Sequence, residues 1–239
     1  MDSRQEESRP VKAGLIVTLL AVGLSLFQLW QPLVGFFPPG AVPFEALLGL
    51  QPATYFRPVH LSWILCLGFL VYPLGKDARL RALDYLSIVA VLWASVRVLS
   101  FDYQSIEHLL NGLATADFYA GLIILAATLE MARRAVGVIM MLIGLIFILY
   151  SLFGYLLPDA LASRGFGLER IVRFQVFTGA GLYGSPLGIA AGAVFSFVLF
   201  GAFLQVTGAG KFLIDLSFAA AGQYRGGPAK ASVLASAAM

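Results

Sequence analysis

Two glycine-rich stretches have the spacing of nucleotide-binding motifs, in which glycine lets the backbone approach a phosphate closely. The stretch GAGLYG places Gly179, Gly181 and Gly184 in the pattern G-x-G-x-x-G of dinucleotide-binding proteins. No strand is predicted before it and no βαβ unit surrounds it, so chance in a glycine-rich chain explains the match. The stretch TGAGKF resembles a phosphate-binding loop, but Gln205 and Phe212 stand where that motif has glycine and Ser or Thr. Neither stretch predicts a nucleotide site.

The histidines and the cysteine are the other side chains that could do chemistry. His60 and His108 lie near predicted span ends or in loops, and a zinc site or a serine–histidine pair needs partners that the sequence does not supply. We predict interfacial histidines with satisfied hydrogen bonds. Cys66 is the single cysteine and lies in an apolar run, which predicts a buried structural thiol. The expectation is a protein that is not an enzyme, with no metal site and no covalently bound cofactor.

Arg97 is the one basic residue inside a predicted membrane span, and an intramembrane charge is costly enough to indicate a function. It lies about one turn from the predicted span end at Ser100, so it can also reach the headgroups or pair within the bundle. Trp93 could offer its ring face to the guanidinium. Both interpretations stay open, with the structural role favoured over a role in transport. Glu130 and Arg134, four residues apart, predict an ion pair at a span boundary.

A row of small residues lies on one predicted helix, formed by Gly188, Gly192 and Ser196 at a spacing of four. Such a row lets two helices approach closely in lipid, where no hydrophobic driving force joins them. The row predicts helix packing within the subunit rather than a contact between two copies.

The composition indicates the environment that must hold these residues. Hydrophobic residues make up 59% of the 239 residues, charged residues only 12%, and the mean hydropathy is +0.86. A soluble domain typically carries about twice that charged fraction. The formal net charge of +3, with Lys and Arg scattered between apolar runs, gives no support to a nucleic-acid partner. We predict an all-α polytopic membrane protein in a lipid bilayer.

Apolar runs near the roughly 20 residues that a helix needs to cross a bilayer divide the chain into about six spans. We place these spans at Ala13–Trp30, Val59–Leu74, Ala82–Ser100, Phe118–Met131, Val136–Leu157 and Pro186–Val206. The first is interpreted as a retained anchor, because no cleavage site closes it. Prolines after it predict an external loop with a short helix near Glu45–Leu50, and Asp159–Arg173 is interpreted as a polar stretch.

The positive-inside rule favours a cytoplasmic N-terminus. This orientation places eight basic residues in the cytoplasm: Arg4, Arg9, Lys12, Lys76, Arg79, Arg81, Arg133 and Arg134. The acidic connections then lie outside, carrying Glu45, Asp102, Glu107 and Asp117, with Arg57 among them. Only the loop with Arg164, Arg170 and Arg173 argues against this orientation.

After the sixth span, the stretch Lys211–Gly222 is too short to cross the membrane and predicts a helix at the cytoplasmic interface. Lys211 and Asp215 can pair within it, and Gly222 suits a C-cap. Pro228 then opens a second helix, rich in Ala and Ser, as is typical of a segment packed against protein rather than lipid. We expect this helix to enter the membrane again from the cytoplasmic side.

The stretch VLFGAFLQVTGAGKFLIDLSFAAAGQYRGGPAKASVLASAAM, Val198–Met239, resembles the large, DctM-like membrane subunit of tripartite ATP-independent periplasmic (TRAP) transporters. Members of that family carry G-x-F-L/M-x-x-[ST]-G, a short helix, R-G-G-P/L-A-[KH] and V-x-A-S. Upstream, LEMARRAVGVIMMLIGLIFILYSLFGYLLPDALASRGFGLERIV and GSPLG are similar to the TAXI-type subgroup, in which small and large subunits are fused. The likeness is strong from Leu129 onward and loose, by topology, before it.

The resemblance implies two domains, a four-helix small-subunit scaffold at residues 1–134 and the beginning of a large transport domain at residues 135–239. It also implies that the chain is truncated inside the first arm of a cytoplasmic re-entrant hairpin. Five residues would form the turn and this arm: Gly226, Gly227, Pro228, Lys230 and Ser236. In the family, a serine–glycine tip that would follow helps to form a sodium site.

By the same resemblance, the chain is expected to be a permease component in the bacterial inner membrane. It would import small organic anions, such as carboxylates, together with sodium, and a periplasmic TAXI-type binding protein would deliver them. The alternative is a non-transporting membrane anchor or assembly subunit. The sequence leaves open the substrate, sodium against proton coupling, and the oligomeric state.

Overall fold

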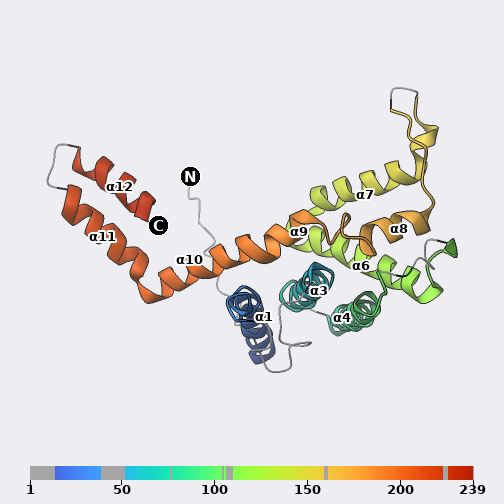
Figure 1. Ribbon diagram of the computed structural model, residues 1–239, viewed down its shortest axis with the longest axis horizontal. Coiled ribbons are helices and arrows are strands. Elements are labelled where there is room, and N and C mark those ends of the chain that lie inside the picture. Colours follow the sequence, from blue (N-terminus) through green and yellow to red (C-terminus); the bar gives the residue numbers. More distant parts are fainter. Residues whose placement is uncertain are drawn as a thin grey trace. The chain divides into compact units, whose positions relative to one another are not determined.

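The computed structural model describes residues 14–38, 52–75, 77–103, 105, 110–158, 161–222 and 226–238 (Figure 1). Six segments are long and apolar enough to cross a membrane: Leu15–Val34, Ala53–Val71, Ala78–Leu99, Thr115–Ala135, Val138–Leu156 and Ser185–Thr207. The predicted fold class, an all-α polytopic membrane protein, is confirmed. The short helix predicted near Glu45–Leu50 falls outside the described residues, as does His108.

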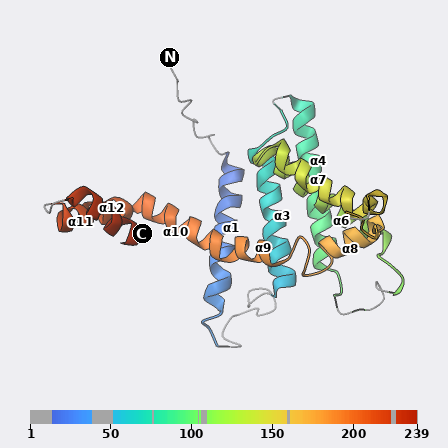
Figure 2. The same ribbon diagram turned by 90° about the horizontal axis from the view of Figure 1, so that it is seen from above.

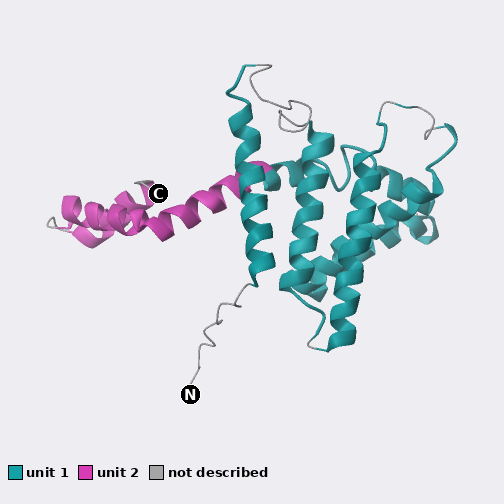
Figure 3. Ribbon diagram, turned by 90° about the horizontal axis from the view of Figure 1, so that it is seen from below, with its two compact units in different colours: residues 1–191 teal, residues 192–239 magenta. Residues whose placement is uncertain are grey.

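The chain divides into two compact units, residues 1–191 and residues 192–239, which Figure 3 colours separately. Each unit is described by itself below. The boundary between these two compact units differs from the predicted domain boundary between residues 134 and 135. The predicted domain boundary stays a prediction.

The first four spans pack in sequence order within unit 1. α1 (Leu15–Val34) lies against α3 (Ala53–Val71), α3 against α4 (Ala78–Leu99), and α4 against α6 (Thr115–Ala135). Figure 2 shows α1 and α3 side by side. Consecutive spans joined by short connections are expected to be neighbours of this kind.

Contacts between α1 and α3 show that these two helices are antiparallel. Near the start of α1, the carbonyl of Leu20 accepts a hydrogen bond from Trp63 Nε1 at 3.1 Å. Further along α1, the ring of Phe27 stacks on that of Phe56 at a centroid distance of 5.5 Å. Residue numbers therefore increase along α1 in the direction in which they decrease along α3.

The second span begins at Ala53, not at Val59 as predicted, so it includes Pro58. A proline inside a helix lacks one N–H and ends the helical hydrogen-bond ladder locally. Pro58 is nonetheless buried, and the helix continues through it because its flanks pack on α1 and α4. Packing here overrides the local preference from which the boundary was predicted.

The core of unit 1 lies between α3, α4 and α6. Its most buried side chains include Leu65 and Phe69 on α3, Val91 and Val98 on α4, and Ile124 on α6. The outward faces of the same helices are apolar and exposed, as a bilayer requires. Because lipid tails are as apolar as leucine, close packing rather than water exclusion holds such helices together.

The fifth span, α7 (Val138–Phe153), ends in a 3-10 turn (Gly154–Leu156), and α8 (Leu168–Val176) follows. Helix α8 occupies most of the second half of the stretch that the sequence analysis interpreted as polar. Its apolar residues Ile171, Val172 and Val176 recur at helical spacing and are all buried. α8 is therefore an amphipathic helix that packs on α6.

A close approach at Gly121 seats α8 on α6. A Cβ at Gly121 would collide with the side chain of Val172 and come within 3.1 Å of the ring of Phe177. Glycine therefore lets the two helices approach more closely than any other residue would. At the start of α8, Glu169 Oε1 accepts the backbone N–H of Leu113 at 2.8 Å, which ties α8 to the connection before α6.

The sixth span is Ser185–Thr207. It consists of α9 (Ser185–Ile189), a π-helical turn (Ala190–Val194) and α10 (Phe195–Thr207). The span was predicted to begin at Pro186, but α9 begins at Ser185, and Gly184 precedes it as the cap. Such a shift of one residue is within the ordinary variation of helix boundaries.

Unit 2 continues with α11 (Ala209–Ala221) and α12 (Gly227–Ala238), which pack on each other. Gly222 is the C-cap of α11, as predicted, and its N–H donates to the carbonyl of Phe218 at 2.7 Å. The predicted pair of Lys211 and Asp215 is not among the ion pairs of the described residues, and both side chains are exposed.

Candidate functional site

The turn into α12 carries the residues that the sequence analysis placed at a hairpin. Gly226 has a φ of +72°, in the left-handed region, and its carbonyl accepts the N–H of Lys230 at 3.1 Å. Gly227 and Pro228 are the first two residues of α12. Proline is tolerated there because the first N–H groups of a helix have no partner within it.

Gly227 is constrained for a different reason. A Cβ on this residue would collide with the carbonyl oxygen of Gly222 and lie 2.9 Å from that of Ala221. Gly226 has nothing within 4 Å of such a Cβ. Gly226 is therefore needed for its left-handed backbone conformation. Gly227 is needed because the backbone passes close to the end of α11.

Small side chains form the buried contact between α11 and α12. Ser217 and Ala221 on α11, and Ala231 and Ala235 on α12, are at most 7% exposed. Each pair is spaced by four, so it lies on one helix face. Ser236, by contrast, is exposed, as is Lys230. The structure thus reverses the chain at this turn and packs α12 on α11. The predicted re-entrant hairpin, of which α12 would be the first arm, and a part of these residues in ion binding both stay predictions.

The small residues predicted to pack against another helix, Gly188, Gly192 and Ser196, do not share one environment. A Cβ at Gly188 would lie 2.9 Å from the guanidinium of Arg57, whose Nη1 donates to the carbonyl of Tyr183 at 2.9 Å. Gly192 has nothing within 4 Å of such a Cβ, and its carbonyl accepts the hydroxyl of Ser196 at 3.0 Å. Gly188 thus makes room for an arginine, and a helix partner for the row stays a prediction.

Arg57 connects α3 to the segment before α9. The ring of Tyr183, whose carbonyl it binds, is 3% exposed, and burial raises the pKa of the Tyr183 phenol. Burial likewise raises the pKa of Tyr103 to about 12. A tyrosine is neutral at physiological pH even without such a shift, so Arg57 carries the charge at this connection.

Arg97 makes an ion pair across two helices. Its Nε and Nη2 lie 3.0 Å and 2.6 Å from Asp117 Oδ1, near the end of α4 and the start of α6. The side chain of Arg97 is 40% exposed and that of Asp117 11%. The pair agrees with the structural interpretation of Arg97, and a direct part in transport is untested.

We expect Arg97→Lys to leave the protein folded and transport nearly unchanged, because lysine keeps the charge beside Asp117 and half-exposed pairs contribute only about 0–1 kcal/mol. The measurement is thermal unfolding of the purified protein, with uptake by the same variant. Asp117→Asn is the matched control from the other partner. A large loss of uptake by Arg97→Lys at normal membrane insertion would assign Arg97 a functional role.

A second and more buried cluster lies at the opposite end of α4 and α6. Arg134 Nη1 donates to Asp84 Oδ1 at 2.6 Å and to the carbonyl of Tyr72 at 3.0 Å. Its Nε donates to Glu130 at 2.7 Å, which confirms the predicted pair. Asp84 Oδ2 accepts the N–H of Leu74 at 3.0 Å. The ends of α3, α4 and α6 therefore meet at one buried pair.

The two clusters show that α4 and α6 are antiparallel. Asp84 near the start of α4 binds Arg134 at the end of α6, whereas Arg97 near the end of α4 binds Asp117 at the start of α6. Along α4, the two charges are about 20 Å apart at 1.5 Å per residue. A bilayer core about 30 Å thick can hold both pairs, one toward each of its edges.

The remaining polar candidates are buried within the helices. His60 is 2% exposed, two turns inside α3, and hydrogen-bonds Gln28 of α1, which is equally buried. It is satisfied, as predicted, but it lies among packed helices rather than at an interface. Cys66 is buried, as predicted. Within the described residues, no group of three or more His, Cys, Asp or Glu could hold a metal ion.

The later part of this architecture has a recognisable sequence. Residues 122–239 match the family described as tripartite ATP-independent periplasmic transporter, DctM component. The match supports the conclusion that this chain is a member of the TRAP transporter family. No curated protein and no solved structure is significantly similar to the chain.

The DctM match covers most of α6 and every helix after it. It includes the sixth span, the amphipathic α8 and the whole α11–α12 hairpin with its glycine turn. Residues 1–121, which hold α1, α3 and α4, lie before the match. The region that the sequence analysis found most similar to the TRAP large subunit is thus the region that the DctM family matches.

Proposed function

We propose that the protein is a TRAP transporter membrane component of the fused TAXI type, which imports small organic anions such as carboxylates together with sodium. A periplasmic binding protein delivers the substrate. The observation that carries this proposal is the DctM match over residues 122–239, which ends in the small-residue hairpin of α11 and α12. The matched family is a transporter component and not an enzyme family.

Within this proposal, the bundle of α1, α3, α4 and α6 acts as a scaffold. Ion pairs link α4 and α6 at both ends, at Arg97 with Asp117 and at Arg134 with Asp84. Two such links resist sliding and tilting of one helix along the other. A rigid element of this kind suits the static part of a transporter in which another part moves.

The α11–α12 hairpin is proposed to begin the moving, ion-binding part. Transporters of this general kind bind ions and anions at helix ends near the bilayer midplane, where backbone dipoles are not cancelled. The contact between α11 and α12 is made of Ala and Ser, so the helices approach closely without bulky side chains. Sodium is then a co-substrate of the hairpin rather than a resident cofactor.

The proposed orientation places the N-terminus in the cytoplasm of a bacterial inner membrane. We expect a cysteine at Phe36 or Asn111 to react with a membrane-impermeant maleimide added outside, and a cysteine at Arg79 to react only after permeabilisation. Cys66 is buried and gives a low background. Labelling of the Arg79 position alone from outside would reverse the orientation.

Transport itself is tested by uptake into liposomes that contain the complete gene product. We expect a labelled carboxylate to accumulate when its binding protein and an inward sodium gradient are both present. Omitting the binding protein or dissipating the gradient should abolish accumulation. A non-transporting anchor would hold the binding protein without any uptake, and uptake that ignores the sodium gradient would contradict the coupling.

A further inference from the structure

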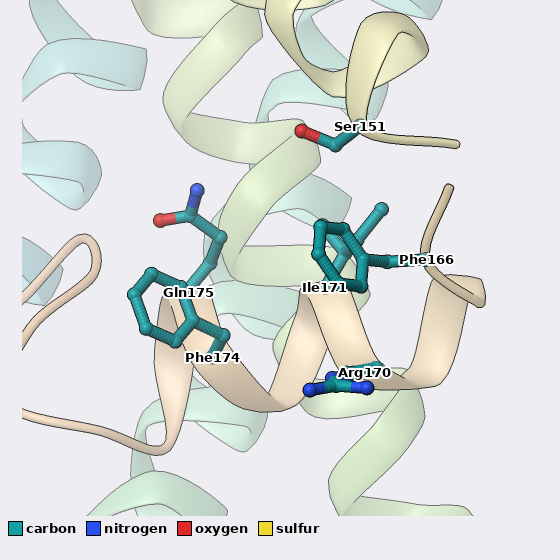
Figure 4. Close-up of a pocket in the computed structure, with 6 residues that line it drawn as sticks. All are labelled: Ser151, Phe166, Arg170, Ile171, Phe174 and Gln175. Atoms are coloured by element: carbon teal, nitrogen blue, oxygen red, sulfur yellow. The ribbon is translucent and has the colours of Figure 1, made fainter. Parts of the chain in front are cut away.

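A cavity of about 340 Å³ lies between the last turn of α7 and the outer side of α8. Six residues line it: Ser151, Phe166, Arg170, Ile171, Phe174 and Gln175. Figure 4 shows these side chains around the space, with Arg170 at one edge and aromatic rings on both sides. Arg170 is the one charged residue among the described residues that line the cavity, so these residues combine apolar walls with a single cation.

Arg170 makes no ion pair with another described residue, so its guanidinium can meet an anion. The guanidinium of Arg170 lies 5.0 Å from the ring centroid of Phe166, which holds it in place without neutralising it. The adjacent acid, Glu169, is occupied by the backbone N–H of Leu113 at 2.8 Å. The amide of Gln175 and the hydroxyl of Ser151 add polar groups on the same cavity.

The position of α8 along α6 places the cavity at the edge of the bilayer. Val172 and Phe177 close on Gly121, which is about 9 Å along α6 from its start at Thr115. Amphipathic helices in a membrane interface bury their apolar face to a depth of about 5–10 Å. Phe174, 53% exposed, extends the apolar surface of α8 beside its arginines, as interfacial helices do.

The surface of α7 leads from the bilayer to the cavity. Phe147 lies one turn before Ser151 and is 67% exposed, and Ile143 before it is 45% exposed. None of the described side chains of α7 is fully buried. An acyl chain can therefore run along this face and end at the apolar walls of the cavity.

We propose that this cavity binds an anionic phospholipid, with the headgroup phosphate on Arg170 and an acyl chain along α7. Arginine binds phosphate through paired N–H donors. The proposal also gives a reason for Arg164 before α8 and for Arg170 and Arg173 on α8, which oppose the positive-inside rule. A lipid headgroup would balance their charge on the predicted outer side. The proposal is independent of the transported substrate.

The test uses phosphatidylglycerol with a photoreactive group in its acyl chain, added to the full-length protein in phosphatidylcholine nanodiscs. We expect labelling of the Phe166 and Phe174 peptides. Arg170→Gln should lower labelling about fivefold, the factor for one basic residue at a membrane surface. Arg170→Lys should retain most of it, because the charge remains. Arg164→Gln is the matched control, since Arg164 is exposed just before α8 and does not line the cavity.

Three results would overturn the proposal. Labelling that Arg170→Gln leaves unchanged would show that the cavity does not hold the headgroup. An equal loss in Arg170→Gln and Arg164→Gln would indicate general surface charge. Displacement of the lipid by millimolar glycerol phosphate would assign the cavity to a free anion. Gel filtration of each variant before labelling establishes that the protein is folded.

Discussion

Replacing Arg134 with leucine should destabilise the helix bundle by about 3–5 kcal/mol, because the change leaves Asp84 as an uncompensated buried charge. The side chains of Arg134 and Asp84 are 8% and 6% exposed, and Nη1 lies 2.6 Å from Oδ1. The same guanidinium also lies 5.0 Å from the ring centroid of Phe69. Loss of Arg134 therefore affects α3, α4 and α6 together. The measurement is the fraction of monodisperse protein after heating in detergent.

Arg133→Leu is the matched control for this experiment. Arg133 is the preceding residue of the same helix and pairs with Glu130, but the side chains are 33% and 32% exposed. Exposed pairs contribute little because water and salt screen them. We therefore expect Arg133→Leu to behave nearly as the unmodified protein does. An equal loss of stability in the two variants would show that the buried pair has no special role.

A second variant separates charge burial from lost packing. Asp84→Asn in the Arg134→Leu background removes the uncompensated carboxylate while an oxygen stays available to the N–H of Leu74. The double variant should be more stable than Arg134→Leu alone. If the two are equally unstable, the contribution of Arg134 lies in its contacts with Phe69 and Tyr72 rather than in its pairing with Asp84.

The spans could be predicted from the sequence because each is a property of a single contiguous segment. An apolar run of suitable length is enough to place a crossing helix, and all six predicted spans correspond to helices. The predicted start of the second span, at Val59, was wrong. The helix begins at Ala53 and continues through Pro58, because it packs there on two neighbouring helices. The stretch Asp159–Arg173, which holds most of α8, was predicted to be polar because Glu169, Arg170 and Arg173 interrupt its apolar positions.

The partners of the charged residues could not be predicted, because they belong to distant parts of the chain. Glu130 with Arg134 was found from its spacing along one helix. Arg97 with Asp117, and Arg134 with Asp84, depend on how helices are placed side by side. The sequence does show that charged residues occur near both ends of the spans that form α4 and α6. It identifies candidates on both helices without saying which of them pair.

The glycine turn shows a partial success of the same kind. The sequence predicted a reversal at Gly226 and Gly227 before Pro228, and the positive φ of Gly226 fits that expectation. The constraint at Gly227 comes from the carbonyls of Gly222 and Ala221, which no pattern of residue types reveals. The two glycines should therefore differ in what they tolerate.

Replacing both glycines, in Gly226→Val with Gly227→Val, should abolish sodium-driven uptake by the complete gene product while membrane insertion continues. A β-branched residue at the φ of Gly226 costs roughly 1–2 kcal/mol. A side chain at Gly227 must also push α12 away from the end of α11, and overpacking of this kind costs about 1–3 kcal/mol. The bundle of unit 1 should stay folded, and a periplasmic binding protein should still bind.

The single variants test the separate reasons for the two glycines. Gly226→Asn should retain most uptake, because asparagine adopts the left-handed conformation more readily than other residues. Gly227→Ala should lose most of it, because even one methyl group meets the carbonyl of Gly222. Gly201→Ala is the matched control, since a Cβ there has nothing within 4 Å and alanine favours a helix. Unchanged uptake in Gly227→Ala and in the double valine variant would mean that α11 and α12 need not stay in contact, and the hairpin would have no part in transport.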